Sequence, residues 1–203
     1  MPQIPASRME QTQDDILDAA VERFSYYGVS KTTLSDIASD VDMSTANLYR
    51  YFKNKEDILV ACCRRCLNDR INCLEQVVAD TTLKADEKLG VFFHEILKYT
   101  YDQFETNSGI NELVNIIAEK HKQVVHDKNK AEQALIKRIL EQGITEHLFN
   151  IADLEKSTIA VHTSLHLFQL PLSMSIHDLE TLKNMANMTT DLLLNGLYTK
   201  NSS

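Results

Sequence analysis

The stretch Thr32–Asp57 reads TTLSDIASDVDMSTANLYRYFKNKED and contains the signals for two short helices joined by a tight turn. Thr33, followed three residues later by Asp36, approximates a capping box at the start of the first helix. Apolar residues then recur at i, i+3, i+4 and i+7 from Leu34 to Val41, which is the pattern of one buried helix face. Ser44 is a typical N-cap for the second helix. The stretch therefore predicts a helix-turn-helix.

Helices are predicted on both sides of this stretch. Apolar residues recur at helical spacing from Ile16 to Phe24, and Gly28 follows, the usual residue type just past a helix C-terminus. Asn54 precedes a further helix start, from which residues 56–78 are predicted to form one long helix. We therefore expect a three-helix N-terminal domain in which the first helix braces the helix-turn-helix.

The second helix, expected over Ser44–Tyr51, leaves side chains exposed that suit contact with DNA. Thr45 and Ala46 are small enough to allow close approach to a major groove, where Asn47 can pair with adenine. The free backbone N–H groups after Ser44 suit a phosphate. Side chains that can reach the phosphate backbone follow directly: Tyr49, Arg50, Lys53 and Lys55. The competing interpretation is that the aromatic residues 49, 51 and 52 are core residues of a small helical bundle.

The rest of the chain is also predicted to be helical. Five Gly and three Pro in 203 residues argue against an all-β protein with many tight turns. Helical patterns cover residues 85–105, 110–118, 124–142 and 153–169, with Gly143 and Pro171 as expected ends, and a last helix follows Asp178. The fold is predicted to be all-α, with a helix-turn-helix domain at residues 1–56 and a larger helical domain at residues 57–203.

Composition limits the function classes. No apolar run approaches the roughly 20 residues of a membrane helix, and the polar segment Met1–Gln13 lacks the apolar core of a secretion signal. The four cysteines lie between Cys62 and Cys73, so they are expected to be reduced thiols of a cytoplasmic protein without a membrane partner. The net charge of −8 does not decide DNA binding, because four of the six bases before Glu56 lie between Lys31 and Lys55.

The N-terminal segment resembles a known family. Residues 16–59, with TTLSDIA at 32–38 and NLYRYFKNKED at 47–57, look like the DNA-binding domain of TetR-family regulators. The resemblance covers about a fifth of the chain, and the remainder is similar to the family only in its length and helical layout. The resemblance implies a homodimer that binds a palindromic operator in double-stranded DNA and usually represses transcription. The dimer would be released from the operator when a small-molecule effector binds the C-terminal domain.

The resemblance also implies residue roles. Thr33, Tyr49 and Lys55 would contact phosphates, and residues 44–47 would face the bases. The turn reads Asp42-Met43 where the family commonly has Gly and a β-branched residue. Asp tolerates a left-handed backbone better than most residues, so the turn is expected to form, whereas its charge, together with Asp40, is expected to weaken DNA binding.

For the larger domain, the resemblance implies a dimer interface formed by the last two helices and an effector site among the helices between about residues 59 and 168. Candidate lining residues mix apolar surface with a few polar groups: Phe92, Phe93, Ile96, Tyr99, Phe104, Ile117 and His121. Most of them could equally be core residues. Their modest charge favours an apolar or aromatic effector, and no resident cofactor is expected.

Two other features allow alternative functions. Cys62, Cys66 and Cys73 share one face of a helix, which is typical of core packing but could form a thiol sensor or, with partners, a metal site. His162 and His166 have the i, i+4 spacing of a two-histidine metal site but lack the glutamate of the zincin motif.

No phosphate loop or nucleophile elbow is present, so no enzymatic activity is expected. The acidic balance leaves open a helical protein-interaction module with a vestigial DNA-binding domain.

Overall fold

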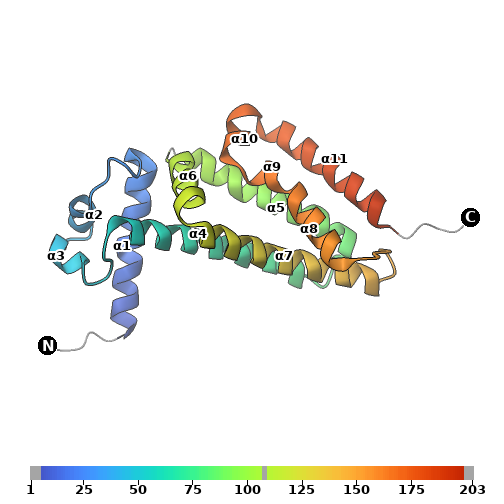
Figure 1. The fold of residues 1–203 in the computed structure, drawn as a ribbon, viewed down its shortest axis with the longest axis horizontal. Helices are drawn as coiled ribbons and strands as arrows, with labels where there is room; N and C mark the ends of the chain where they lie inside the picture. The colour runs from blue at the N-terminus through green and yellow to red at the C-terminus, as the bar shows by residue number, and fades with distance from the viewer. Residues whose placement is uncertain (1–5, 107–108, 199–203) are drawn as a thin grey trace, which may run out of the picture. The chain divides into compact units, whose positions relative to one another are not determined.

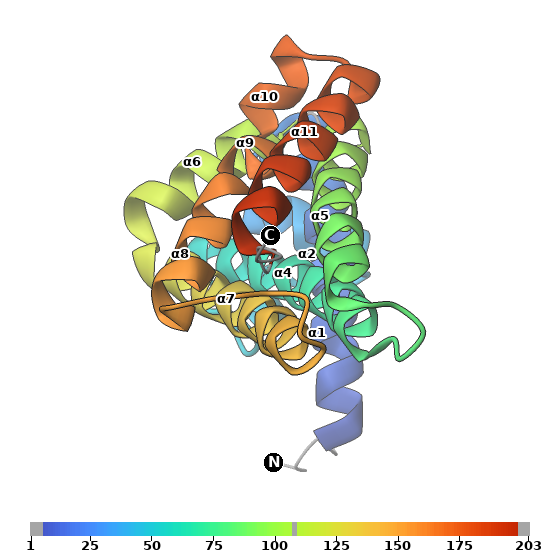
Figure 2. The same ribbon diagram turned by 90° about the vertical axis from the view of Figure 1, so that its right-hand side faces the viewer.

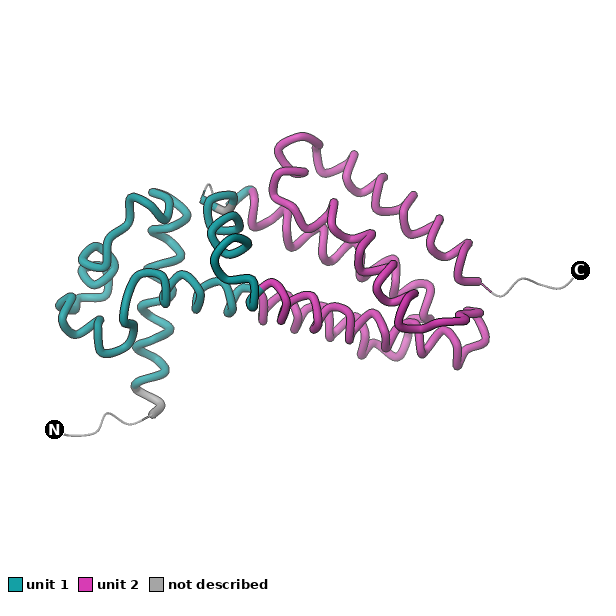
Figure 3. Tube along the Cα trace, in the orientation of Figure 1, with its two compact units in different colours: residues 1–66, 105–124 teal, residues 67–104, 125–203 magenta. Residues whose placement is uncertain are grey.

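The computed structural model describes residues 6–106 and 109–198, and every named element in this part of the chain is an α-helix (Figure 1). The chain divides into two compact units, drawn in different colours in Figure 3. Unit 1 contains residues 1–66 and 105–124, and unit 2 contains residues 67–104 and 125–203. The predicted all-α fold with an N-terminal helix-turn-helix is confirmed. The division into domains at residue 56 stays a prediction.

Unit 1 is built around the helix-turn-helix. It contains α1 (Ala6–Tyr27), α2 (Leu34–Asp40), α3 (Thr45–Leu48), the start of α4 (Lys55–Ala79) and α6 (Ile110–Lys120). Its core is made by the apolar positions that the sequence pattern indicates, all with at most 2% exposure: Ile16, Ala20, Phe24, Ile37, Ala38, Leu48, Ile58 and Leu59. These side chains fix α2 and α3 against α1 and α4.

Unit 2 is a larger helical bundle. It contains the rest of α4, most of α5 (Ala85–Thr106) and α7 (Lys122–Thr145), and then α8 (Leu154–Ser164), α9 (His166–Gln169), α10 (Pro171–Ile176) and α11 (Leu179–Leu197). In Figures 1 and 2, α11 runs alongside α8 and α9. Large side chains from four of these helices close the core: Phe92, Phe93, Ile136, Ile139, Phe168 and Leu182.

Local signals in the sequence explain where many of these helices begin and end. Gly28 follows α1 with φ +83°, and Asp42 adopts φ +51°, so the left-handed turn that the Asp42-Met43 sequence was expected to tolerate is present. Thr33 and Asp36 form a full capping box at α2. The hydroxyl of Ser44 accepts a hydrogen bond from the backbone N–H of Asn47 at 3.2 Å, which confirms the N-cap of α3.

Helices α3 and α7 end at other residues than the sequence predicts. Helix α3 ends at Leu48, not Tyr51, because the N–H groups of Arg50 and Tyr51 bond three residues back and form tight turns. Helix α7 continues through Gly143 to Thr145. Gly143 is needed there because a Cβ would lie 2.0 Å from the ring of Phe149.

The predicted helix over residues 153–169 is divided into α8 and α9. The hydroxyls of Thr163 and Ser164 donate to the carbonyls of Ile159 and Val161, and the N–H of Leu165 bonds three residues back at 3.2 Å. Such side-chain bonds compete with the regular helix ladder. Pro171 then begins α10, since a proline at the first helical position removes no helical hydrogen bond.

Within the described residues, no helix is both long and apolar enough to cross a membrane.

Candidate DNA-binding site

Helix α3 presents the four residues that the sequence assigns to base contacts. Leu48 is completely buried and anchors the helix, while Ser44 and Ala46 are exposed and Thr45 and Asn47 are half-buried. Ala46 places only a small side chain on the exposed face in the middle of α3. The arrangement therefore provides a surface that a groove wall can approach closely.

Tyr49 and Arg50 continue this surface. Tyr49 is 54% exposed, so it is not a core residue, whereas Phe52 is buried and Tyr51 packs against the core of unit 1. The guanidinium of Arg50 donates from Nη1 to Oδ1 of Asn47 at 3.4 Å. This weak bond is exposed, so both side chains can exchange it for contacts with a base or a phosphate.

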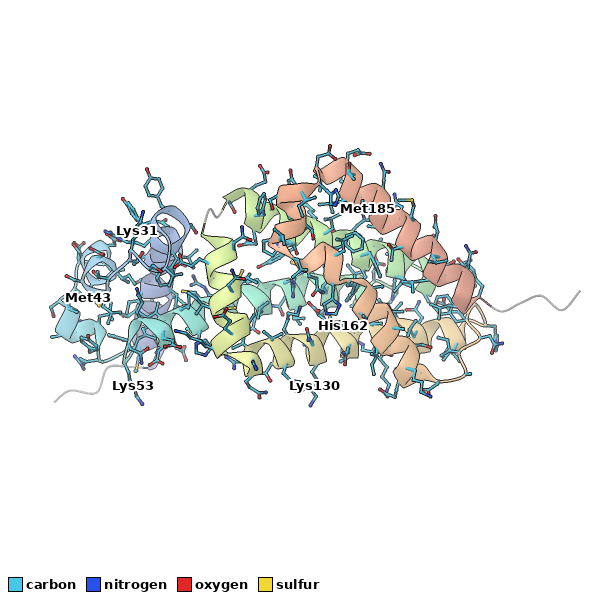
Figure 4. All side chains as sticks on the ribbon, turned by 45° about the horizontal axis from the view of Figure 1, so that its top comes forward. Lys31, Met43, Lys53, Lys130, His162 and Met185 are labelled. Atoms are coloured by element: carbon cyan, nitrogen blue, oxygen red, sulfur yellow. The ribbon has the colours of Figure 1, made fainter. Side chains whose placement is uncertain are left out.

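The cations near α3 have different surroundings. Lys31 and Lys53, both labelled in Figure 4, are exposed, as is Arg50. Lys55, predicted to contact a phosphate, instead donates from Nζ to the carbonyls of Val29 and Thr32 at 2.8 and 2.9 Å. It therefore holds the segment between α1 and α2, and its contact with a phosphate stays a prediction.

Thr33 also has internal partners. Its hydroxyl donates to the Asp36 carboxylate at 2.7 Å and accepts from the Asp36 backbone N–H at 3.2 Å. The Thr33 hydroxyl and N–H bonds hold the pKa of Asp36 below its ordinary value. Thr33 is exposed at the start of α2, and its predicted phosphate contact would add to this capping role.

The acidic residues near the turn are not equivalent. Asp40 accepts two hydrogen bonds from Arg23, at 2.5 and 2.7 Å, and these bonds lower the pKa of Asp40. The guanidinium of Arg23 also lies 5.6 Å from the centre of the Tyr27 ring. The charge of Asp40 is therefore compensated by Arg23. The weakening of DNA binding by Asp40 and Asp42 stays a prediction.

A contact that the sequence did not indicate fixes the loop before α2. The Glu112 carboxylate of α6 accepts from the backbone N–H groups of Val29 and Ser30, at 2.9 and 3.0 Å, and from the Ser30 hydroxyl. The Ser30 hydrogen bond is the main reason that the pKa of Glu112 is lowered. A Cβ at Gly28 would lie 2.9 Å from this carboxylate, so the residue that ends α1 also makes room for it.

The predicted effector-lining residues do not all lie in one unit. Phe92, Phe93 and Ile96 are completely buried in the core of unit 2, and the partly buried Phe104 packs against this core. Tyr99 is a half-buried residue of the same unit. The other two candidates belong to unit 1: Ile117 is buried on α6, and Nε2 of His121 lies 2.8 Å from Oε1 of Glu56. Their role in effector binding stays a prediction.

The thiol and histidine candidates have other partners. The buried thiol of Cys62 lies 3.7 Å from the carbonyl oxygen of Leu17, and burial raises the pKa of Cys62 to about 12. Cys66 is half-buried and Cys73 is exposed. His162 is bonded to Glu132 at 3.0 Å and His166 to the carbonyl of Thr163 at 2.6 Å. Among the residues that the structure describes, no group of three or more His, Cys, Asp or Glu could hold a metal ion.

Comparisons with known proteins agree with this geometry. Residues 16–62 match the family model of bacterial regulatory proteins, tetR family. A curated relative, the HTH-type transcriptional repressor KstR2 of Mycolicibacterium smegmatis, is 24% identical over 148 residues, which is 73% of this chain and 70% of the relative.

Solved structures share the fold over nearly the whole chain. A transcriptional regulator from Cytophaga hutchinsonii has a TM-score of 0.76 at 21% identity, covering 93% of this chain and 99% of that one. The transcriptional regulator FadR from Bacillus subtilis, solved in complex with stearoyl-CoA, has a TM-score of 0.63 at 20% identity, with 91% and 99% covered.

Proposed function

Since this chain is a DNA-binding transcriptional regulator of the TetR family, we propose that it is a cytoplasmic homodimeric repressor that binds a palindromic operator. The exposed surface of α3, held in place by the buried Leu48, carries this proposal. Each protomer would insert α3 into a major groove, with half-sites one helical turn or a multiple apart, roughly 34–36 Å per turn. This function requires no catalytic step.

The dimer is supported by an apolar surface on unit 2. Seven large apolar side chains from α8 to α11 are at least 40% exposed: Ile159, Leu167, Leu170, Leu172, Ile176, Met188 and Leu192. Met188 and Leu192 lie one turn apart on α11, and Ile159 is on α8, which runs alongside it (Figures 1 and 2). Large apolar side chains exposed on neighbouring helices are typical of an interface. The interface would therefore involve the last helices, as the resemblance implies.

Release from DNA would follow a population shift. A small molecule that binds one arrangement of the helices more tightly than the other must favour that arrangement. Within unit 1, Glu112 of α6 holds the loop before α2. A displacement of α6 would therefore change the contacts that hold the helix-turn-helix in place. We favour an apolar or aromatic effector, in keeping with the apolar core of unit 2 and with the stearoyl-CoA bound by the B. subtilis protein.

The alternative function as a thiol-sensing regulator has less support. A raised pKa keeps the Cys62 thiol protonated at neutral pH, and the protonated thiol is the unreactive form. Nor is a vestigial DNA-binding domain favoured, because Tyr49 and Arg50 are exposed beside α3.

The change Tyr49→Phe tests the phosphate contact. Losing the hydroxyl is expected to weaken operator binding by about 1–3 kcal/mol, a typical hydrogen-bond contribution to a charged group, without changing stability. The measurement is a titration of the operator upstream of the protein's own gene at fixed salt. Lys55→Ala is the less clean variant, because Lys55 also holds the loop carbonyls of Val29 and Thr32. Unchanged affinity of the Tyr49→Phe variant would contradict the assignment.

The change Asn47→Ala tests base reading. A residue that pairs with one base is expected to relax discrimination at that base position, by about 1–3 kcal/mol, and to leave other positions unaffected. Binding is measured against a set of operators with single base changes. Tyr49→Phe serves as the control, because loss of a phosphate contact should weaken all operators equally. Equal weakening by Asn47→Ala would show that Asn47 does not read a base.

A further inference from the structure

A buried ionic cluster lies in unit 2. Glu132 of α7 has no exposed surface; its carboxylate lies 2.5 Å from Nη2 of Arg70 and 3.0 Å from Nε2 of His162. It also accepts a hydrogen bond from Gln169 at 2.9 Å and lies 3.6 Å from Nζ of Lys128. We call these five residues the Glu132 cluster. Figure 4 labels its member His162.

The charges of the Glu132 cluster do not cancel. Nε2 of His162 lies 3.0 Å from the Glu132 carboxylate, and its Nδ1 lies 3.4 Å from Nε2 of Gln133. Burial opposes ionisation of Glu132, but the bonds from His162 and the charges of Arg70 and Lys128 outweigh it and lower the pKa of Glu132 to about 2. Two cations therefore face one anion.

Three buried polar atoms on the helices that form the cluster have no hydrogen-bond partner in the described part of the chain. They are Nε of Arg70, the hydroxyl of Thr158 and Oδ1 of Asn129. Arg70 is 6% exposed and Thr158 only 2%, so neither residue has much access to solvent. Thr158 lies one turn before His162 on α8, and Asn129 lies one turn before Glu132 on α7. A buried polar group without a partner costs about 1–3 kcal/mol, so these positions are not arranged for stability alone.

Aromatic and half-buried side chains surround the cluster. The guanidinium of Arg70 lies 6.0 Å from the centre of the Tyr99 ring. Phe168, which precedes Gln169 in the chain, packs edge to face against Phe93 in the core of unit 2. On the outer side, Nζ of Lys128 donates to the side-chain oxygen of Gln169 at 2.5 Å, and both residues are only partly buried. Lys128 and Gln169 are thus the members of the cluster with the most exposure to solvent.

We propose that the Glu132 cluster binds the carboxylate of an otherwise apolar organic acid, which is the effector of this regulator. The proposal rests on the proposed function and names the chemical class of its effector. The carboxylate would accept from Nε of Arg70 and from the Thr158 hydroxyl, displace Gln169 from Lys128, and neutralise the extra positive charge. The amide of Asn129 can turn its NH2 group toward the acid, because the two ends of an amide are nearly isosteric.

Matched probes test the head group. The full-length protein is titrated by calorimetry with decanoate, 1-decanol and decanoyl-CoA, which share one apolar chain. Decanoate is expected to bind at least about tenfold more tightly than decanol, since a hydrogen bond to a charged group contributes about 1.5–3 kcal/mol. Equal binding of acid and alcohol, preference for the thioester, or no binding of decanoate would overturn the proposal.

The variant Thr158→Val separates a ligand contact from a structural role. It keeps the side-chain shape but removes the unpartnered hydroxyl, so the ligand-free protein is expected to melt at a higher temperature while decanoate binds about tenfold more weakly. The control is Thr100→Val, a second buried threonine of unit 2 whose hydroxyl donates to the carbonyl of Ile96 at 2.9 Å. The control should not melt higher and should bind decanoate normally.

A hydroxyl that a buried water satisfies would give the opposite result for Thr158→Val: a lower melting temperature and unchanged decanoate binding. The half-buried Lys128 allows a second test, because Lys128→Gln should weaken decanoate binding and leave decanol binding unchanged. An operator titration keeps the two proposals apart. If the protein binds the operator and decanoate does not release it, only the proposed effector class is contradicted. If the protein binds decanoate but no operator, the proposed function is contradicted.

Discussion

Replacing Met188 and Leu192 together by aspartate is expected to give a monomer that binds the operator at least about a hundredfold more weakly. Both side chains are exposed on α11, at 63% and 75%, one turn apart on the proposed dimer surface. Like charges brought together across an interface cost several kcal/mol, and a monomer retains only one half-site contact. Native mass is measured by light scattering, and operator affinity is measured on the same sample.

The matched control is the pair Asn68→Asp and Asn72→Asp. These exposed residues of α4 have the same i, i+4 spacing and lie outside the apolar surface, so the control adds two negative charges without reaching the interface. It should remain a dimer. A Met188/Leu192 variant that stays dimeric with normal affinity would show that α11 does not form the interface.

The parts of the fold that sequence reasoning predicted are those that depend on neighbours in the chain. The capping box of Thr33 and Asp36 and the N-cap at Ser44 each join residues three apart, and the left-handed Asp42 is a property of one residue. The buried face of α2 follows from its own spacing. Local rules were sufficient for these features because local hydrogen bonds determine them.

The contacts that hold the helix-turn-helix in place could not be predicted in this way. Arg23 and Asp40 lie 17 residues apart, Lys55 reaches a carbonyl 26 residues away, and Glu112 reaches Val29 across 83 residues. Each pairing depends on how helices pack, and an isolated Arg, Lys or Glu in the sequence carries no signal of it. For the same reason the sequence pattern predicts a helix end at Gly143, whereas this glycine makes room for Phe149.

The predicted sites differ in how well composition can find them. The exposed residues of α3 could be identified because one face of the helix has to be apolar to pack on the core, and the opposite face is then exposed to solvent. In unit 2 the aromatic residues that suit an effector also suit a core, and Phe92 and Phe93 are completely buried. The ionic Glu132 cluster was missed apart from His162, because Arg70, Glu132 and Gln169 come from three helices far apart in the chain.

The change Glu132→Ala is expected to cost about 3–5 kcal/mol of folding stability, the typical result of leaving a buried charge unpaired. The guanidinium of Arg70, which is 6% exposed, would lose the carboxylate oxygen that lies 2.5 Å from it. Urea unfolding at fixed protein concentration measures the loss, because the proposed dimerisation would make stability depend on concentration. The double variant Arg70→Met with Glu132→Met replaces the pair by apolar groups and should be far less destabilised.

The dependence on pH follows from the pKa of Glu132, which is lowered to about 2 from an ordinary value of 4.5. A carboxyl group whose pKa is lower in the folded state stabilises the protein fully above its unfolded pKa, and that contribution disappears as pH falls through the folded pKa. Between about pH 4.5 and 2, the normal protein should therefore lose about 3 kcal/mol more stability than the double variant. Parallel curves for the two proteins would show that Glu132 is not held ionised by Arg70, Lys128 and His162, because its protonation would then cost the fold nothing.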